Sequence, residues 1–143
     1  MGVTTNLRLF KKEYDGFIKD FEDGVRLARN EMANAMEQLA KNEIKGKRKP
    51  NEKAEAGQPP KNRTGNLRRS ITQVRSRAGF GMYNATVGPT MKYSRAVEEG
   101  GKYAPRSWHG TSAMAGFPYM RPAFEKFKKG PMQEIINKYL GEF

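Results

Sequence analysis

The sequence contains no cysteine, and only one of its 143 residues is a histidine, His109. The lack of cysteine excludes disulfides, thiolate catalysis and cysteine-ligated zinc, and one histidine cannot supply the clustered ligands of a zinc site. A catalytic triad would need a nucleophile and an acid around His109, and the nearby Ser107 and Ser112 show no spacing typical of one. We therefore expect a protein that is not an enzyme and binds no metal or cofactor, with His109 as a surface loop residue.

Long apolar runs are also absent, since hydrophobic residues make up only 36% of the chain. No stretch is apolar and long enough to span a bilayer, so we expect no membrane partner. The length predicts a single domain over residues 1–143 with a moderate core. A subunit completed by neighbouring copies would fit the low apolar content.

Positive charge is abundant and unevenly distributed, with a net charge of +12. Residues 1–44 carry a net charge of −1, residues 45–77 a net charge of +9 and residues 78–143 a net charge of +4. A concentrated basic segment favours a polyanionic partner such as nucleic acid. A solvated basic loop, or one that meets an acidic protein surface, is an equally good interpretation of the charge alone.

An apolar repeat with spacings of three and four residues predicts one long helix over about residues 6–44. Gly16 and Gly24 weaken such a helix and make a bend or break possible there. A helix of this length exceeds the width of a small domain, so it must fold back or lie against another subunit. The candidate subunit interface is the first part of the repeat: Phe10, Tyr14, Phe17, Phe21 and Val25.

The remaining pattern predicts an α+β fold with a small antiparallel sheet. Residues 45–63 are rich in proline and basic side chains and read as a flexible loop. Two β-rich stretches, "LRRSITQVRSR" and "MYNATVGP", predict a hairpin, with "FPYM" as a third strand or an extended segment. A short middle helix over "MKYSRAVEEGG" and a C-terminal helix broken at Gly130-Pro131 are expected to complete the fold, the latter packed on the sheet.

The stretch "RTGNLRRS" combines a glycine turn with positive charge, as a phosphate loop does. It has one glycine and lacks the Lys-Ser/Thr pair of such loops. No zinc-finger, basic-zipper or clear helix-turn-helix pattern appears, and residues 45–77 contain no aromatic residue for base stacking. Any contact with nucleic acid is therefore expected through phosphates, without sequence readout.

Three short stretches in order carry a resemblance to a known family. They are Thr64–Ile71 ("TGNLRRSI"), Tyr93–Gly100 ("YSRAVEEG") and Tyr119–Ala123 ("YMRPA"). With the leading helix they resemble the head–tail joining and tail-completion proteins of long-tailed, siphovirus-type phages, the family of lambda minor tail protein Z-like tail components. The matching positions, which we take as the fold junction, are Thr64, Gly65, Leu67, Ser70, Ile71, Tyr93, Val97, Glu98, Gly100, Pro122 and Ala123. Ser94, where the family usually has alanine, and the long segment 102–116 depart from the pattern.

The resemblance implies a structural virion protein without activity or cofactor. Such proteins form rings, often hexamers, at the phage neck or tail top, where they complete the tail and meet the head connector around the DNA channel. The implied partners are other copies of the chain, connector or adaptor proteins, tail tube proteins and genomic DNA, with assembly in the host cytoplasm. The alternative is a nucleic-acid-binding protein without sequence specificity. Candidate contacts to DNA or a partner ring are Lys45, Lys47, Arg48, Lys49, Lys61, Arg63, Arg68 and Arg69.

Overall fold

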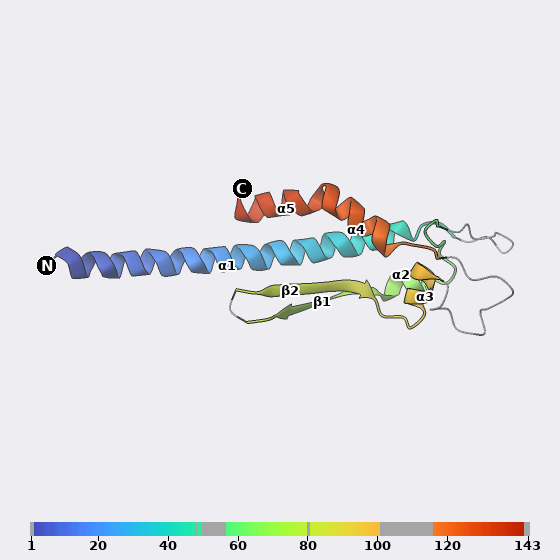
Figure 1. Cartoon of the computed structure of the whole chain (residues 1–143), viewed down its shortest axis with the longest axis horizontal. Coiled ribbons are helices and arrows are strands. Elements are labelled where there is room, and N and C mark those ends of the chain that lie inside the picture. Colours follow the sequence, from blue (N-terminus) through green and yellow to red (C-terminus); the bar gives the residue numbers. More distant parts are fainter. Residues whose placement is uncertain (1, 48, 50–56, 80, 101–115, 142–143) are drawn as a thin grey trace.

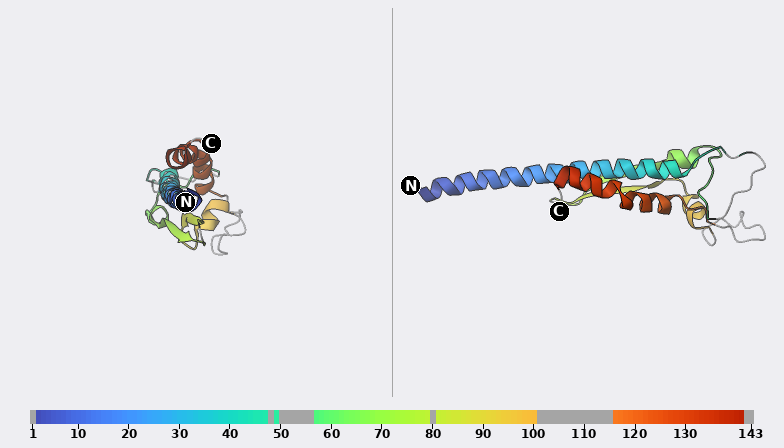
Figure 2. Two further views of the ribbon diagram at one scale, coloured as in Figure 1. Left: turned by 90° about the vertical axis from the view of Figure 1, so that its left-hand side faces the viewer. Right: turned by 90° about the horizontal axis from the view of Figure 1, so that it is seen from above.

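One long helix forms the spine of the molecule, with a β-hairpin on one side and two shorter helices on the other (Figures 1 and 2). We describe it from a computed structural model, which covers residues 2–47, 49, 57–79, 81–100 and 116–141. Arg48 and His109, together with most of the predicted loop 102–116 and part of the predicted loop 45–63, lie outside these described residues. The predicted α+β class is confirmed.

Helix α1, Gly2–Glu43, contains 42 residues without interruption, which corresponds to about 63 Å at 1.5 Å per residue. The predicted long helix is thus confirmed, and neither Gly16 nor Gly24 breaks it. Gly24 has a packing role, because a Cβ there would lie 3.0 Å from the carbonyl oxygen of Tyr139. The missing side chain lets the C-terminal helix approach the backbone of α1.

The hairpin consists of β1, Ile71–Arg77, and β2, Tyr83–Pro89, paired antiparallel from Ile71 opposite Pro89 to Arg77 opposite Tyr83. The predicted hairpin is confirmed, although the residues before Ile71 form a short helix, α2, Asn66–Ser70, and do not extend the strand. In α2 the Ser70 hydroxyl donates to the Leu67 carbonyl at 2.7 Å, a local bond that competes with strand pairing.

Arg29 fastens the hairpin to the middle of α1. Its Nη1 donates to the carbonyl oxygens of Ser76 on β1 and Asn84 on β2, both at 3.0 Å. Its guanidinium carbon lies 5.4 Å from the centre of the Tyr83 ring. One side chain therefore holds both strands near their turn, where carbonyls that point to α1 would otherwise lack a donor.

The C-terminal region forms two helices, α4, Met120–Lys129, and α5, Pro131–Leu140. The predicted break at Gly130-Pro131 is present, since proline has no N–H to continue a helix and begins the next one well. Phe127 of α4 and Ile135 of α5 are buried against Ala28 and Met32 of α1. The start of α4 also packs against the hairpin in a shared core, whereas α5 lies along α1 on the side opposite the strands (Figure 2).

The sheet has only these two strands among the described residues. Phe117 and Pro118, from the stretch predicted as a third strand or an extended segment, belong to no strand and lead into α4. The short middle helix is α3, Ser94–Glu99. Within the described part of the chain, no helix combines the length and apolar character needed to cross a membrane.

A pH-dependent contact joins α5 to α1, where Glu31 accepts from the Lys138 ammonium at 2.8 Å and from the Tyr139 hydroxyl at 2.6 Å. The hydrogen bond from Lys138, followed by that from Tyr139, lowers the pKa of Glu31 below 4.5. A lowered folded-state pKa stabilises the fold above pH 4.5, and this contribution disappears as the pH falls through the folded-state value.

We expect Glu31→Gln to flatten the loss of stability below pH 4.5 in acid unfolding followed by circular dichroism. Glu125→Gln, which removes an exposed carboxylate of α4, should keep the parent profile; an identical profile for Glu31→Gln would contradict the prediction.

Candidate functional site

The turn before α2 is built by the first of the three family-like stretches. Gly65 has φ of 79°, and the Arg69 backbone N–H donates to its carbonyl at 2.9 Å. The Arg69 guanidinium donates to the Thr64 carbonyl at 3.1 Å and to the Asn66 side-chain oxygen at 2.7 Å. Arg69, predicted as a DNA or partner contact, therefore stabilises its own turn, which makes it a poor probe of surface charge.

Gly65 is the position in this turn where a side chain is least tolerable. Its left-handed φ disfavours any residue with a Cβ, and a Cβ would lie 2.8 Å from Nη1 of Arg69. We expect Gly65→Val to lower the free energy of unfolding by about 2–3 kcal/mol, because the β-branched residue adds backbone strain to the displaced arginine. Thermal unfolding should show this loss of stability. Gly57→Val is the control, because Gly57 also has a positive φ but has nothing within 4 Å of the position of a Cβ. The difference between the two variants therefore separates the effect of the contact with Arg69 from that of backbone strain. A melting temperature unchanged by Gly65→Val would contradict the expectation.

The second stretch supplies the cap of α4. Glu98, near the end of α3, accepts backbone N–H groups from Tyr119 at 2.8 Å and Met120 at 3.0 Å on Oε2, and from Arg121 at 3.0 Å on Oε1. The first N–H groups of a helix have no partner within the helix, and a carboxylate at this end also interacts favourably with the helix dipole. Glu98 thus joins α3 to α4 and leaves α4 without need of a local capping side chain.

The three stretches meet in one core near the end of α1. Ile71, Tyr119 and Ala123 are each fully buried, together with Ala40 and Ile44 of α1. The partly buried hydrophobic residues packed on this group include three from the stretches: Leu67, Val97 and Met120. The family-like residues that contact one another are therefore packing and capping residues. Thr64 lies on the exposed turn, and Tyr93 and Pro122 are half-buried.

The predicted basic contacts gather at this same end of the molecule. Gly46 accepts from the Asn62 N–H at 3.0 Å, and Lys47 and Asn62 form a parallel bridge, so the chain around residues 45–47 lies beside that around residues 61–63. Helix α2 follows directly. The described predicted contacts in this region are exposed: Lys45, Lys47, Lys49, Lys61, Arg63, Arg68 and Arg69.

The predicted subunit interface lies at the opposite end. Phe10, Tyr14, Phe17 and Phe21 are 47–67% exposed, and Val25 is half-buried. Phe10 stacks on Tyr14, and Phe17 on Phe21, each pair with ring centres 6.3 Å apart. The free part of α1 extends past both the hairpin and α5 (Figure 1). It is an apolar helix face with no covering element from its own chain among the described residues.

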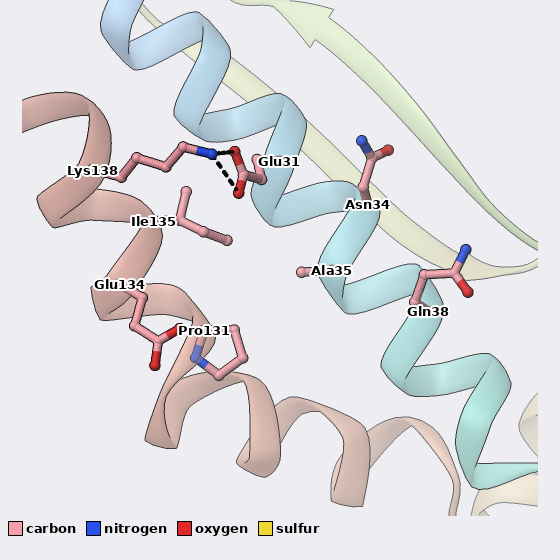
Figure 3. Close-up of a pocket in the computed structure, with 8 residues that line it drawn as sticks. All are labelled: Glu31, Asn34, Ala35, Gln38, Pro131, Glu134, Ile135 and Lys138. Carbon is pink, nitrogen blue, oxygen red and sulfur yellow. Dashed lines mark hydrogen bonds and ion pairs between the residues drawn. The ribbon is translucent and has the colours of Figure 1, made fainter.

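A shallow groove of about 430 Å³ lies between α1 and α5 (Figure 3). The Lys138–Glu31 pair bridges its two helices. Its lining is Glu31, Asn34, Ala35, Gln38, Pro131, Glu134, Ile135 and Lys138. It offers no nucleophile paired with a base, and no group of three or more possible metal ligands occurs among the described residues.

Sequence reasoning missed the functions of Glu98 and Arg29. The sequence predicted Glu98 only as a position of the second family-like stretch, and the N–H groups that it binds lie 21–23 residues further along the chain. Arg29 falls on the polar side of the α1 repeat, and nothing near it in sequence indicates the two strand carbonyls that it binds. Comparison of the chain with protein-family models, curated proteins and solved structures gave no match.

Proposed function

We propose that this chain is a structural virion protein that forms a ring, hexameric by the resemblance, at the neck or tail top of a siphovirus-type phage. The ring would complete the tail and join it to the head connector around the DNA channel. The observation that carries the self-assembly part is the bare aromatic face of α1. Four aromatic side chains at 47–67% exposure on consecutive turns form a contiguous apolar patch, and such patches mark interaction surfaces.

The placement in a phage tail depends on the order of the three stretches and on their structural relation. In the structure their residues converge on one core and one cap. This supports the resemblance as one of architecture. It leaves the exposed ends of the molecule, basic at one and aromatic at the other, as the surfaces that would contact partners.

The test is electron microscopy of particles that contain this chain, together with the mass of the purified protein by light scattering. We expect a ring of copies at the top of the tail and a mass above that of one chain. A protein that stays monomeric at all accessible concentrations, and that is missing from the neck and tail of purified particles, would overturn the proposal.

A second candidate function, binding of nucleic acid through phosphates, is favoured by the clustering of exposed basic residues around the end of α1. Affinity for a DNA duplex of arbitrary sequence should fall steeply between low and physiological salt. The variant Lys45→Glu/Lys47→Glu should bind DNA more weakly, and its affinity should fall less steeply as the salt concentration rises. Lys12→Glu/Lys19→Glu makes the same charge change at the far end of α1 and serves as the matched control. Equal affinity of both variants would reject this function.

A further inference from the structure

The bare part of α1 has the seven-residue repeat of a helix that packs against other helices. Leu7, Tyr14 and Phe21 occupy the first position of successive heptads, and Phe10 and Phe17 the fourth. All five are exposed in the structure, at 47–67%. These are the a and d positions at which side chains of one helix insert between those of a partner helix. The seam extends about 21 Å along the helix axis.

This seam continues directly into the face that α4 and α5 cover. Further along α1, Ala28 is buried and Met32 and Leu39 pack on the two C-terminal helices. Cover ends near Gly24, where the Tyr139 carbonyl is closest, at the end of α5. Helices of the same chain thus cover the apolar face of α1 beyond Gly24, whereas no described element covers the face before it (Figure 2).

The charges beside the seam select the orientation of a partner helix that is identical to α1. The positions on one side, Lys11, Ile18 and Val25, are basic or apolar, while Glu13 and Asp20 on the other side are acidic. An antiparallel pair of copies sets the two acidic sides against each other, so that Glu13 meets Glu13 or Asp20 of the second copy. A parallel pair in register sets Glu13 and Asp20 against the uncharged Ile18 and Val25 of the second copy and avoids like charges. Self-pairing is therefore favoured in the parallel sense.

The apolar side positions also bear on the number of helices. Ile18 and Val25 widen the seam from two to three positions per heptad. A strict two-position seam is typical of a two-stranded coiled coil, whereas a three-position face suits a bundle in which each helix has two neighbours. Parallel helices with two neighbours each are what a rotational axis through several copies produces.

We propose that the amino-terminal parts of α1, residues 7–21, from several copies of this chain pack in parallel and in register as a bundle around one axis. The proposal deepens the homo-oligomer part of the proposed function and rests on it. It assigns the partner of the aromatic face as the same face of another copy. All basic ends of the subunits would then point in the same direction along the axis.

The lack of cysteine allows a direct test on the full chain by single introduced cysteines. On mild oxidation, the cysteine of Leu7→Cys should form a disulfide with the same cysteine of another copy, because parallel, in-register helices bring the same a positions together. A mixture of Leu7→Cys with Phe17→Cys should give no mixed disulfide, since those positions would be about 15 Å apart along the axis and Cα atoms further apart than about 7 Å cannot be bridged. Lys19→Cys, on the outward face, is the matched control and should cross-link at least tenfold more slowly.

Mass measurements separate this proposal from the proposed function. Phe10→Glu/Phe17→Glu should dissociate the oligomer, whereas Lys12→Glu/Lys19→Glu should not; an unchanged helical content would show that both fold. An oligomer that persists in Phe10→Glu/Phe17→Glu overturns the bundle and leaves the ring proposal standing. A mixed Leu7–Phe17 disulfide, or an oligomer without the Leu7 disulfide, overturns the parallel arrangement. A parent protein that stays monomeric at all accessible concentrations overturns the bundle, and the ring proposal falls with it if the chain is also missing from purified particles.

Discussion

Replacing Tyr119 by alanine is expected to lower the free energy of unfolding by about 3–5 kcal/mol, the range for truncating a large buried aromatic residue. Tyr119 is fully buried and is the largest side chain of its core, where α1, α4 and the start of the hairpin meet. Truncation would leave a cavity among Ile44, Ile71 and Ala123 that these small and β-branched neighbours cannot fill. Since domains are stable by only about 5–15 kcal/mol, this single change would bring the protein close to unfolding.

Urea unfolding followed by circular dichroism would measure the effect, with Tyr119→Phe as the matched control. The ring remains in that variant, so it should retain most of the stability that Tyr119→Ala loses. Burial, and after it the negative charge of Glu98, raises the pKa of Tyr119, so the hydroxyl stays neutral throughout the pH range of the experiment. A midpoint for Tyr119→Ala equal to that of the parent would show that this core does not hold the fold together.

Replacing Glu98 by glutamine is expected to lower the free energy of unfolding by about 2–3 kcal/mol. The carboxylate accepts three N–H groups at 2.8–3.0 Å, and bonds to a charged acceptor are the stronger ones. Glutamine keeps one acceptor oxygen but places an NH₂ group against N–H donors, and it removes the charge that interacts with the dipole of α4.

Glu99→Gln is a close control, because Glu99 is the adjacent acidic residue on α3 and is exposed, 3.6 Å from Arg95. Its removal should change stability by no more than about 1 kcal/mol, the usual contribution of an exposed ion pair. Both variants would be compared by thermal unfolding. Equal losses for the two would mean that net charge, and not the cap, accounts for the effect of Glu98.

The elements themselves were predictable wherever the sequence pattern is strong and local. The three-and-four repeat from Phe10 to Leu39 predicts α1, and Gly130-Pro131 predicts the break between the two C-terminal helices. The alternation in "MYNATVGP" predicts β2. The exposure of the first part of the repeat could also be anticipated, because a helix of this length extends past a small core.

The tertiary contacts were not predictable, because they join residues distant in sequence. Glu98 binds N–H groups of a kind that every helix start presents, and nothing in the sequence marks the start of α4 as its target. Arg29 binds backbone carbonyls, which carry no sequence signal at all. The bonds of Arg69 within its own turn were not predicted, because its partners, Thr64 and Asn66, are turn residues whose geometry depends on the φ of Gly65.

The cap and turn contacts at the basic end also determine where this protein tolerates added sequence. The chain leaves α3 at Gly100 and returns at Phe117, whose N–H donates to the Val97 carbonyl at 2.7 Å, while Gly116 accepts from Gly57 at 3.0 Å. The points at which the chain departs and returns therefore lie side by side in the fold. We therefore expect an affinity tag or fluorescent domain inserted between Gly100 and Gly116 to leave α1 and its aromatic seam unchanged.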